Sequence, residues 1–398
     1  MTWTLRTRSS SWALGGERIA RLRRPGAWWV VSNEAHGPEK GVLPGTRDTV
    51  RIGVIGCGNV LQEMYYPRAR ALSPGLVEFV AACDLEESRR ELVRERLGLT
   101  RFSTDYRELV DADDIDLLLV LTPMQTHGEI ALAAIEAGKH VLVEKPMATT
   151  LEQGRRLVEA SRTSRGYLVP APHVVLSPTF QDMRKRIQGG DIGRVHLARA
   201  LQGWSGPDWG QWFYRKGGGS LFDLGVYSIT TLTGLIGPAR RVTAFVGIAN
   251  PERVAEGETI TAEADDNEQV LIDFGDQTYA VVTTGYTIQE HRRPWIELYG
   301  SNGTIQTLGF LEGFELWQSD LGDWQIYRDR RHLEWHFTDG LTHLVNCIRD
   351  GVRPLVTPEH AFHVLEIMLQ AMECGRDGQA REIESTFTPP SFSGPEPG

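Results

Sequence analysis

Hydrophobic and polar positions follow two different periods along the chain, and the change comes near residue 172. Between residues 50 and 171, short continuous apolar runs alternate with stretches of helical periodicity; the runs are "VRIGVIG", "LVEFVAACD", "DLLLVLTP" and "HVLVE". Such alternation predicts an open parallel sheet with right-handed helical crossovers. We therefore expect an α/β Rossmann domain over residues 49–171.

Beyond residue 172 the pattern becomes a helix-like stretch followed by runs in which apolar and polar residues alternate. "DFGDQT" and "GSNGT" separate neighbouring runs as hairpin turns do. The last helix-like segments, "GLTHLVNCIRDG" and "PEHAFHVLEIMLQAMECGRDG", are expected to pack against the resulting sheet. This half, residues 172–390, is predicted to be an α+β domain with a large, mainly antiparallel sheet.

The first 48 residues differ from the rest, with eight Lys or Arg against four acids. Arg23-Arg24 raises the possibility of twin-arginine export, but the apolar stretch behind it is too short for a signal segment. We expect residues 1–48 to be a disordered extension. No stretch approaches the length of a membrane span.

Charge and cysteine usage narrow the function further. The net charge of -10 argues against a nucleic-acid partner. The four cysteines are scattered and form no CxxC pair and no grouping with histidines, so neither a disulfide framework nor a metal site is predicted. A reducing cytoplasm is the expected location.

A glycine turn follows the first strand and opens a helix, which is the context of a dinucleotide fingerprint. Gly56 and Gly58 would allow backbone amides to approach a diphosphate, although position 61 is leucine where the motif has a third small residue. Asp84 ends the second strand, where a carboxylate accepts ribose hydroxyls and repels a 2'-phosphate. NAD is therefore favoured, while two arginines one turn further on, Arg89 and Arg90, keep NADP as an alternative.

Ligands of such sheets bind beyond the carboxyl ends of the strands, where Lys145 follows "HVLVE". In the second half, "GGGSLFDLGVY" brings backbone close to a neighbour through three glycines, and Ser220 is predicted to cap the next helix. Asp223 and Tyr227 are four residues apart and should share one helix face. Each of these side chains also has a purely structural explanation: a solvated charge, a first-turn carboxylate and a buried aromatic.

An aromatic loop, "GWSGPDWGQWFY", precedes the glycines and includes Trp209 and Tyr214. Flat rings with polar rims suit the apolar face of a sugar, but they could equally close a domain junction or a subunit interface. Arg215 could bind a carboxylate or phosphate, or could be solvated.

Several motifs in the same order resemble the glucose-fructose oxidoreductase, inositol dehydrogenase and rhizopine-catabolism (Gfo/Idh/MocA) family over residues 50 to 385. They are "GVIGCGN", "CD" at 83–84, "LTPMQTH", "EKP", "GGDIG", "GGGSLFDLGVY" and "ELYGSNGT". The resemblance implies that Lys145, with a cis bond to Pro146, reaches the substrate hydroxyl beside the nicotinamide. It also implies a substrate contact for His173 and a cofactor site made of Gly56, Gly58, Asn59, Val60, Asp84, Thr122, Pro123, His127, Glu144 and Lys145.

One position departs from many relatives, which have histidine as the general base where this chain has Tyr227. We expect the Lys145 ammonium to lower the pKa of that phenol, so that Tyr227 accepts the hydroxyl proton while Lys145 stabilises the alkoxide. Asp223 would orient Lys145 or the substrate.

The leading function is an NAD-dependent oxidoreductase acting on a hydroxyl carbon of a sugar, polyol or related cyclic alcohol. Two alternatives remain at this point: a redox-neutral glycosidase that uses a transient keto-sugar, and a non-catalytic regulator that senses NAD(P). The resemblance also implies that residues 172–390 serve for substrate binding and oligomerisation, and that the protein is a homodimer or homotetramer.

Overall fold

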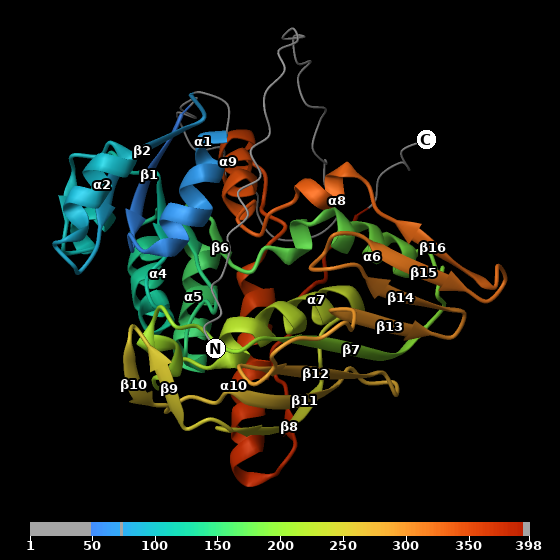
Figure 1. Cartoon of the computed structure of the whole chain (residues 1–398). Helices are drawn as coiled ribbons and strands as arrows, with labels where there is room; N and C mark the ends of the chain where they lie inside the picture. Colours follow the sequence, from blue (N-terminus) through green and yellow to red (C-terminus); the bar gives the residue numbers. More distant parts are fainter. Residues whose placement is uncertain (1–48, 72–74, 393–398) are drawn as a thin grey trace, which may run out of the picture. The chain divides into compact units, whose positions relative to one another are not determined.

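The structure, a computed structural model, describes residues 49–71 and 75–392; the predicted extension, residues 1–48, lies outside them. Its first sheet has six parallel strands in the order β3-β2-β1-β4-β5-β6, of which β1, β2 and β6 are labelled in Figure 1. The strands are β1 Val50–Ile55, β2 Val77–Cys83, β3 Phe102–Ser103, β4 Leu117–Val120, β5 His140–Val143 and β6 Leu168–Pro170. Order and direction are those of a Rossmann sheet, as predicted.

Helices connect these strands, which explains why the strands read as continuous apolar runs. Every residue of β4 and β5 is buried, as expected for strands covered on both faces. The helical segments are η1 Val60–Tyr65, α1 Tyr66–Ala71, α2 Arg89–Leu97, α3 Arg107–Val110, η2 Met124–Thr126, α4 His127–Glu136 and α5 Leu151–Thr163.

The second sheet has nine strands in the order β16-β15-β14-β13-β7-β12-β11-β8-β17. All neighbours in it are antiparallel except β7 and β12, so the sheet is mixed and mostly antiparallel. The strands are β7 Val195–Gly203, β8 Arg241–Gly247, β11 Asn267–Asp273, β12 Tyr279–Gly285, β13 Ile296–Gly300, β14 Gly303–Thr307, β15 Phe314–Gln318, β16 Asp323–Tyr327 and β17 Arg381–Glu382. Both predicted hairpins, β11–β12 and β13–β14, are confirmed.

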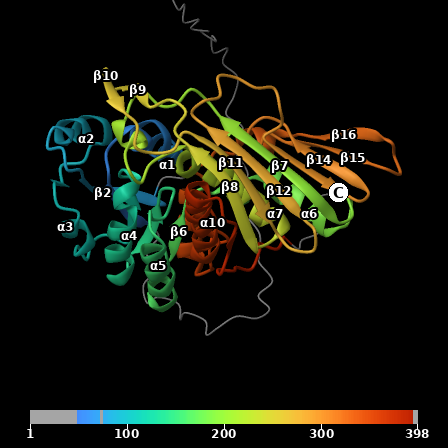
Figure 2. The ribbon, with the colours of Figure 1, turned by 90° about the horizontal axis from the view of Figure 1, so that it is seen from below.

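A separate hairpin and eight helical segments complete the second half. The hairpin is β9 Glu252–Ala255 with β10 Glu258–Thr261. The helical segments are η3 Val174–Leu176, α6 Pro178–Gln188, η4 Gln211–Tyr214, η5 Leu221–Gly225, α7 Val226–Ile236, α8 Arg330–Glu334, α9 Gly340–Asp350 and α10 Pro358–Asp377. Helix α10 packs against β8 and also against α5, so it joins the two halves (Figure 2). Within the described ranges, no helix combines the length and apolar character that crossing a membrane requires.

The tri-glycine segment leads into η5 and α7, but Ser220 does not cap the helix with its side chain as predicted. Its hydroxyl lies 2.7 and 2.6 Å from the two carboxyl oxygens of Glu268 on β11 instead. A serine hydroxyl carries one hydrogen, so a proton on the carboxyl would let each of the two contacts be a full hydrogen bond. Burial accordingly raises the pKa of Glu268 to about 8.

This buried carboxyl should make stability depend on pH. The folded protein keeps the Glu268 proton up to about pH 8, whereas the unfolded chain loses it near its ordinary pKa, so stability falls as pH rises between these values and then levels off. We expect Glu268→Gln to be more stable than the wild type at pH 8, by about 2–3 kcal/mol. Urea unfolding at several pH values tests this.

The difference in unfolding free energy between Glu268→Gln and the wild type should shrink toward pH 5. Glu252→Gln, at an exposed position on β9, is the control and should follow the wild-type pH dependence. Parallel stability curves for wild type and Glu268→Gln would contradict the assignment of a proton to Glu268.

Candidate active site

The glycine turn after β1 has the shape that close approach of a ligand requires. Gly56 has φ +98°, and a Cβ there would lie 2.6 Å from the carbonyl carbon of Leu121, so only glycine fits. A Cβ on Gly58 would meet nothing within 4 Å, so the backbone in front of it is open. Asn59 and Val60 follow, both exposed, where η1 begins.

Asp84 ties this turn to the end of β2. Its carboxylate accepts hydrogen bonds from the backbone N–H of Cys57 (2.8 Å) and of Glu86 (3.0 Å). Each oxygen keeps a further lone pair that a ribose hydroxyl could use. The side chains of Arg89 and Arg90, which kept NADP as an alternative, pair with Glu86 and Glu87. The turn and the carboxylate therefore fit an NAD molecule.

The turns that follow β4 and β5 are joined by His127. Its ring nitrogens lie 2.7 Å from the carbonyl oxygen of Thr122 and 2.8 Å from that of Pro146, and the residue is buried. Burial lowers the pKa of His127. The structure therefore uses His127 to hold two loops together; direct contacts of His127, Thr122 and exposed Pro123 with a cofactor stay predictions.

Glu144 fixes the Lys145 turn from the side of the first helix. The hydroxyl of Tyr65, in η1, donates to one Glu144 oxygen (2.8 Å), and the backbone N–H of Lys145 donates to the other (3.0 Å). Glu144 is buried, and the Lys145–Pro146 bond is cis, as the resemblance implies. Both Glu144 oxygens are thus already engaged within the fold.

Lys145 reaches across to the second half and forms an ion pair with Asp223. Its Nζ lies 2.5 Å from Asp223 Oδ1 and 2.8 Å from the Asp223 carbonyl oxygen. The other carboxylate oxygen accepts from the hydroxyl of Tyr286 (2.9 Å). An ammonium has three N–H donors, so one of them is left for a substrate oxygen. Burial opposes the charge on Lys145, but Asp223, Tyr227 and Glu144 outweigh it and raise the pKa of Lys145.

Tyr227 lies beside this ammonium, and Lys145 Nζ is 5.3 Å from the centroid of its ring. No described residue forms a hydrogen bond with its hydroxyl. The expectation of a lowered pKa is wrong, because burial outweighs the attraction of Lys145 and raises the pKa of Tyr227 to about 12. The structure thus brings the three predicted catalytic side chains together, with Tyr227 as a neutral phenol.

The residues predicted to bind substrate are less closely grouped. His173 is fully buried; its Nδ1 contacts the carbonyl oxygen of Phe337, and its Nε2 has no partner among the described residues. The Tyr214 hydroxyl donates to the carbonyl oxygen of Pro207 (2.7 Å) and its ring packs on Tyr286, so it lies behind the site.

The two other predicted substrate contacts are engaged elsewhere. Trp209 is half exposed and stacked on Trp204, and Arg215 pairs with Glu263. Neither has a described contact with Lys145 or Tyr227. Their roles toward a substrate stay predictions.

Sequence reasoning missed the aromatic surroundings of Tyr227. Phe310 meets the Tyr227 ring edge-on at 5.5 Å and lies 4.4 Å from Trp295 and 6.4 Å from Trp335, between ring centroids. These three rings come from three separate loops, so no local sequence pattern could predict that they lie together. Among the described residues no group of His, Cys, Asp and Glu could hold a metal ion.

Two family profiles match this chain. "Oxidoreductase family, NAD-binding Rossmann fold" matches residues 50–169, and "GFO/IDH/MocA C-terminal domain" matches residues 180–306. Among solved structures, levoglucosan dehydrogenase in complex with NADH and levoglucosan has a TM-score of 0.74 and 21% identity, over 84% of this chain and 99% of that one. At that identity the likeness concerns the fold.

Curated relatives agree with the profiles. A D-glucoside 3-dehydrogenase of Escherichia coli (strain K12) is 30% identical over 48% of this chain, and the match spans about half of that protein, 55%. A dTDP-3,4-didehydro-2,6-dideoxy-alpha-D-glucose 3-reductase of Saccharopolyspora spinosa is 31% identical over 65% of this chain and 74% of the relative. The chain therefore belongs to the GFO/IDH/MocA family of oxidoreductases and has its NAD-binding Rossmann fold.

Proposed function

We propose that this protein is an NAD-dependent dehydrogenase that interconverts a secondary hydroxyl and a ketone on a sugar or cyclic polyol. The observation that carries the proposal is that Lys145 and Tyr227, contributed by the two halves of the chain, lie side by side. Lys145 has one N–H to spare, and the Tyr227 hydroxyl has no partner among the described residues. The relatives named for a D-glucoside and for a didehydro-dideoxyglucose nucleotide support a sugar substrate.

Each side chain then has a defined task. The turn at residues 56–60 and Asp84 would hold NAD, which when bound would accept the hydride from the hydroxyl carbon of the substrate. The free N–H of Lys145 donates to the substrate oxygen and stabilises its negative charge, while Asp223 holds the ammonium in place. The Tyr227 hydroxyl exchanges a proton with the same oxygen.

The resting protonation state suits the reductive direction. Because the pKa of Tyr227 is raised to about 12, the phenol carries its proton at neutral pH and can deliver it to a carbonyl oxygen. Oxidation requires the phenolate, which becomes more abundant as pH rises. The same site therefore serves both directions, with oxidation favoured in alkali.

His173 is proposed as a substrate contact because it follows β6, the neighbour of β5 that leads to Lys145, and its Nε2 is unpartnered. The pKa of His173 is lowered by burial, so the ring is neutral and Nε2 can accept from a substrate hydroxyl. For the location we propose the cytoplasm, which is supported by four unpaired, buried cysteines.

We further propose that two copies associate through the nine-stranded sheet. Strand β11 alternates exposed and buried residues, and apolar side chains are exposed beside one another on its outer face and on β12, β7 and β8. They are Leu197, Phe245, Leu271, Tyr279 and Val281. Polar side chains lie among them, because Val281 pairs with Arg199 and Phe245 pairs with Gln269. An exposed face this rich in apolar side chains is typical of a subunit interface.

Removing the ammonium should abolish turnover without affecting cofactor binding. We expect Lys145→Ala to lower kcat roughly a thousandfold or more, since the transition-state charge loses its donor, while NADH affinity changes little. The assay is NADH formation with a panel of hexoses, hexosides and inositols. Product formation without net NADH would favour redox-neutral chemistry instead, and a Lys145→Ala enzyme with near wild-type kcat would refute the site.

The pH dependence should identify the proton-transferring group. For the wild type, kcat/KM of oxidation should rise about tenfold per pH unit below the pKa of Tyr227, and that of reduction should stay flat. Tyr227→Phe should lower kcat/KM in both directions by about a hundredfold or more, and its kcat/KM of oxidation should no longer rise with pH. Tyr327→Phe, on β16, is the control for loss of a phenol. If kcat/KM of oxidation still rises with pH in Tyr227→Phe, a group other than Tyr227 is the base.

Charging the outer sheet face should separate the subunits. Light scattering should find a dimer or tetramer for the wild type and a folded monomer for Phe245→Glu combined with Leu271→Lys, because charges in an apolar interface must be desolvated. Val352→Glu, an exposed position after α9, should leave the mass unchanged. A monomeric wild type at micromolar concentration would contradict the interface.

A further inference from the structure

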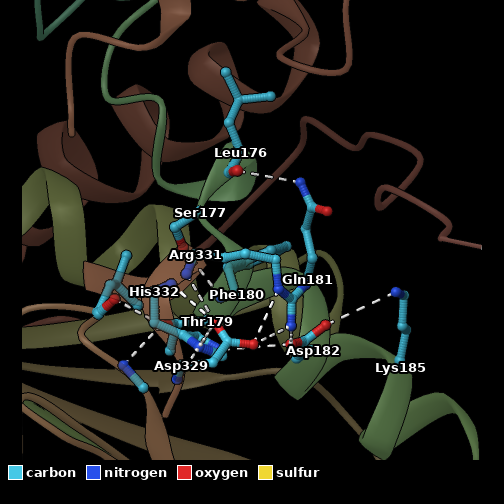
Figure 3. A network of polar contacts seen from close by, with 12 residues as sticks. Leu176, Ser177, Thr179, Phe180, Gln181, Asp182, Lys185, Asp329, Arg331 and His332 are labelled. Carbon is cyan, nitrogen blue, oxygen red and sulfur yellow. Dashed lines mark hydrogen bonds and ion pairs between the residues drawn. The ribbon is translucent and has the colours of Figure 1, made fainter. Parts of the chain in front are cut away.

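The segment that runs from the last residue of α8 to α9, residues 334–339, is held firmly at its beginning. Asp329 caps α8 by accepting from the backbone N–H of Arg331 (2.8 Å), and it contacts His332 Nδ1 at 2.9 Å. Asp182 of α6 faces the other ring nitrogen of His332 at 3.4 Å and pairs with Arg331 at 3.2 Å (Figure 3). The start of the segment is thereby fixed to α6.

The same segment is also attached to the first half. Arg68 of α1 donates to the carboxylate of Asp339 (2.6 Å) and to the carbonyl oxygen of Glu334 (3.2 Å). His173 contacts the carbonyl oxygen of Phe337, and a Cβ on Gly340 would collide with the His173 ring. Residues 334–339 therefore cross from one half to the other over the loop that follows β6.

Trp335 is the large side chain that this segment adds to the aromatic cluster around Tyr227. Phe310 packs on both of them: its ring centroid lies 5.5 Å from that of Tyr227 and 6.4 Å from that of Trp335, and the Phe310 and Trp335 rings are inclined by 32°. The centroids of the Tyr227 and Trp335 rings are therefore no farther apart than the sum of these two distances. A hydroxylated six-membered ring with one substituent can bridge such a span.

The indole N–H of Trp335 is buried and has no partner among the described residues. An indole N–H can only donate, and buried donors in native proteins are nearly always bonded to protein, water or ligand. Trp295, whose ring also packs on Phe310, donates its N–H to the hydroxyl of Ser228 (3.0 Å). The Trp295 N–H is thus engaged within the fold, whereas the Trp335 N–H has no hydrogen-bond acceptor among the described residues.

We propose that Trp335 is a specificity-determining residue, whose indole N–H donates to a hydroxyl or ring oxygen of the substrate remote from the reacting carbon. This inference rests on the proposed function. The favoured substrates are then cyclic polyols or pyranosides that present an apolar ring face to the Phe310–Trp335 wall and an oxygen acceptor at its far end.

The test compares Trp335→Phe with wild type, using methyl β-D-glucopyranoside, D-glucose, myo-inositol and their monodeoxy derivatives. On a parent compound that turns over, Trp335→Phe should lower kcat/KM about tenfold through KM. For the wild type, one deoxy derivative should have a kcat/KM about tenfold below that of its parent compound. For Trp335→Phe, the same derivative and its parent should have equal kcat/KM. An equal loss on every compound would overturn the proposal, because it would reflect packing alone. Trp324→Phe, an exposed position on β16, is the control.

A second readout does not require turnover. In ¹⁵N-tryptophan-labelled protein, the signal that Trp335→Phe removes should shift and exchange more slowly with solvent when a compound of the panel is added with NADH. A signal unmoved by every compound would overturn the proposal and indicate a bound water as its partner. Binding that shifts this signal without any NADH-linked turnover would reject the proposed function and leave the role of Trp335 in place.

Discussion

The ion pair between Lys145 and Asp223 is the interaction on which the site depends. Only 14% and 12% of the two side chains is exposed, so both charges have lost most of their water. Such a pair is stable because each charge has further partners: the carbonyl oxygen of Asp223 for the ammonium and the Tyr286 hydroxyl for the carboxylate. Removing either partner would leave a buried charge alone, at a cost of about 3–5 kcal/mol.

The loops that carry the site are in turn held by buried polar contacts from neighbouring elements. Glu144 and Tyr65 hold the Lys145 turn against the first helix, and His127 joins the same turn to the end of β4. Ser220 and Glu268 hold the segment that leads to Asp223. Because these contacts come from both sheets, the position of the ammonium is determined by the whole fold and not by its own loop.

Much of the first sheet and of the cofactor site could be predicted from the sequence, because the patterns that indicate them are local. The glycine turn, Asp84 and the run of apolar strands each lie within a few residues and determine backbone geometry directly. Lys145, Asp223 and Tyr227 could be named as partners only through the order of motifs shared with a known family.

Features that depend on distant contacts could not be predicted. Tyr65, Tyr286 and Trp335 reach the site from loops and helices far apart in the chain. The side chain of Ser220 was expected to cap a helix, but it bonds to the carboxyl of Glu268 on β11 instead. The pKa of Tyr227 depends on how completely its surroundings exclude water, which no sequence pattern records.

A double-mutant cycle tests most directly whether Lys145 and Asp223 act as one unit. Lys145→Ala, Asp223→Ala and the double variant would be compared by kcat/KM for one substrate. If Asp223 acts by holding the ammonium, the double variant should be about as impaired as Lys145→Ala alone. Losses that multiply would contradict a joint role and would mean that each residue contributes to catalysis separately.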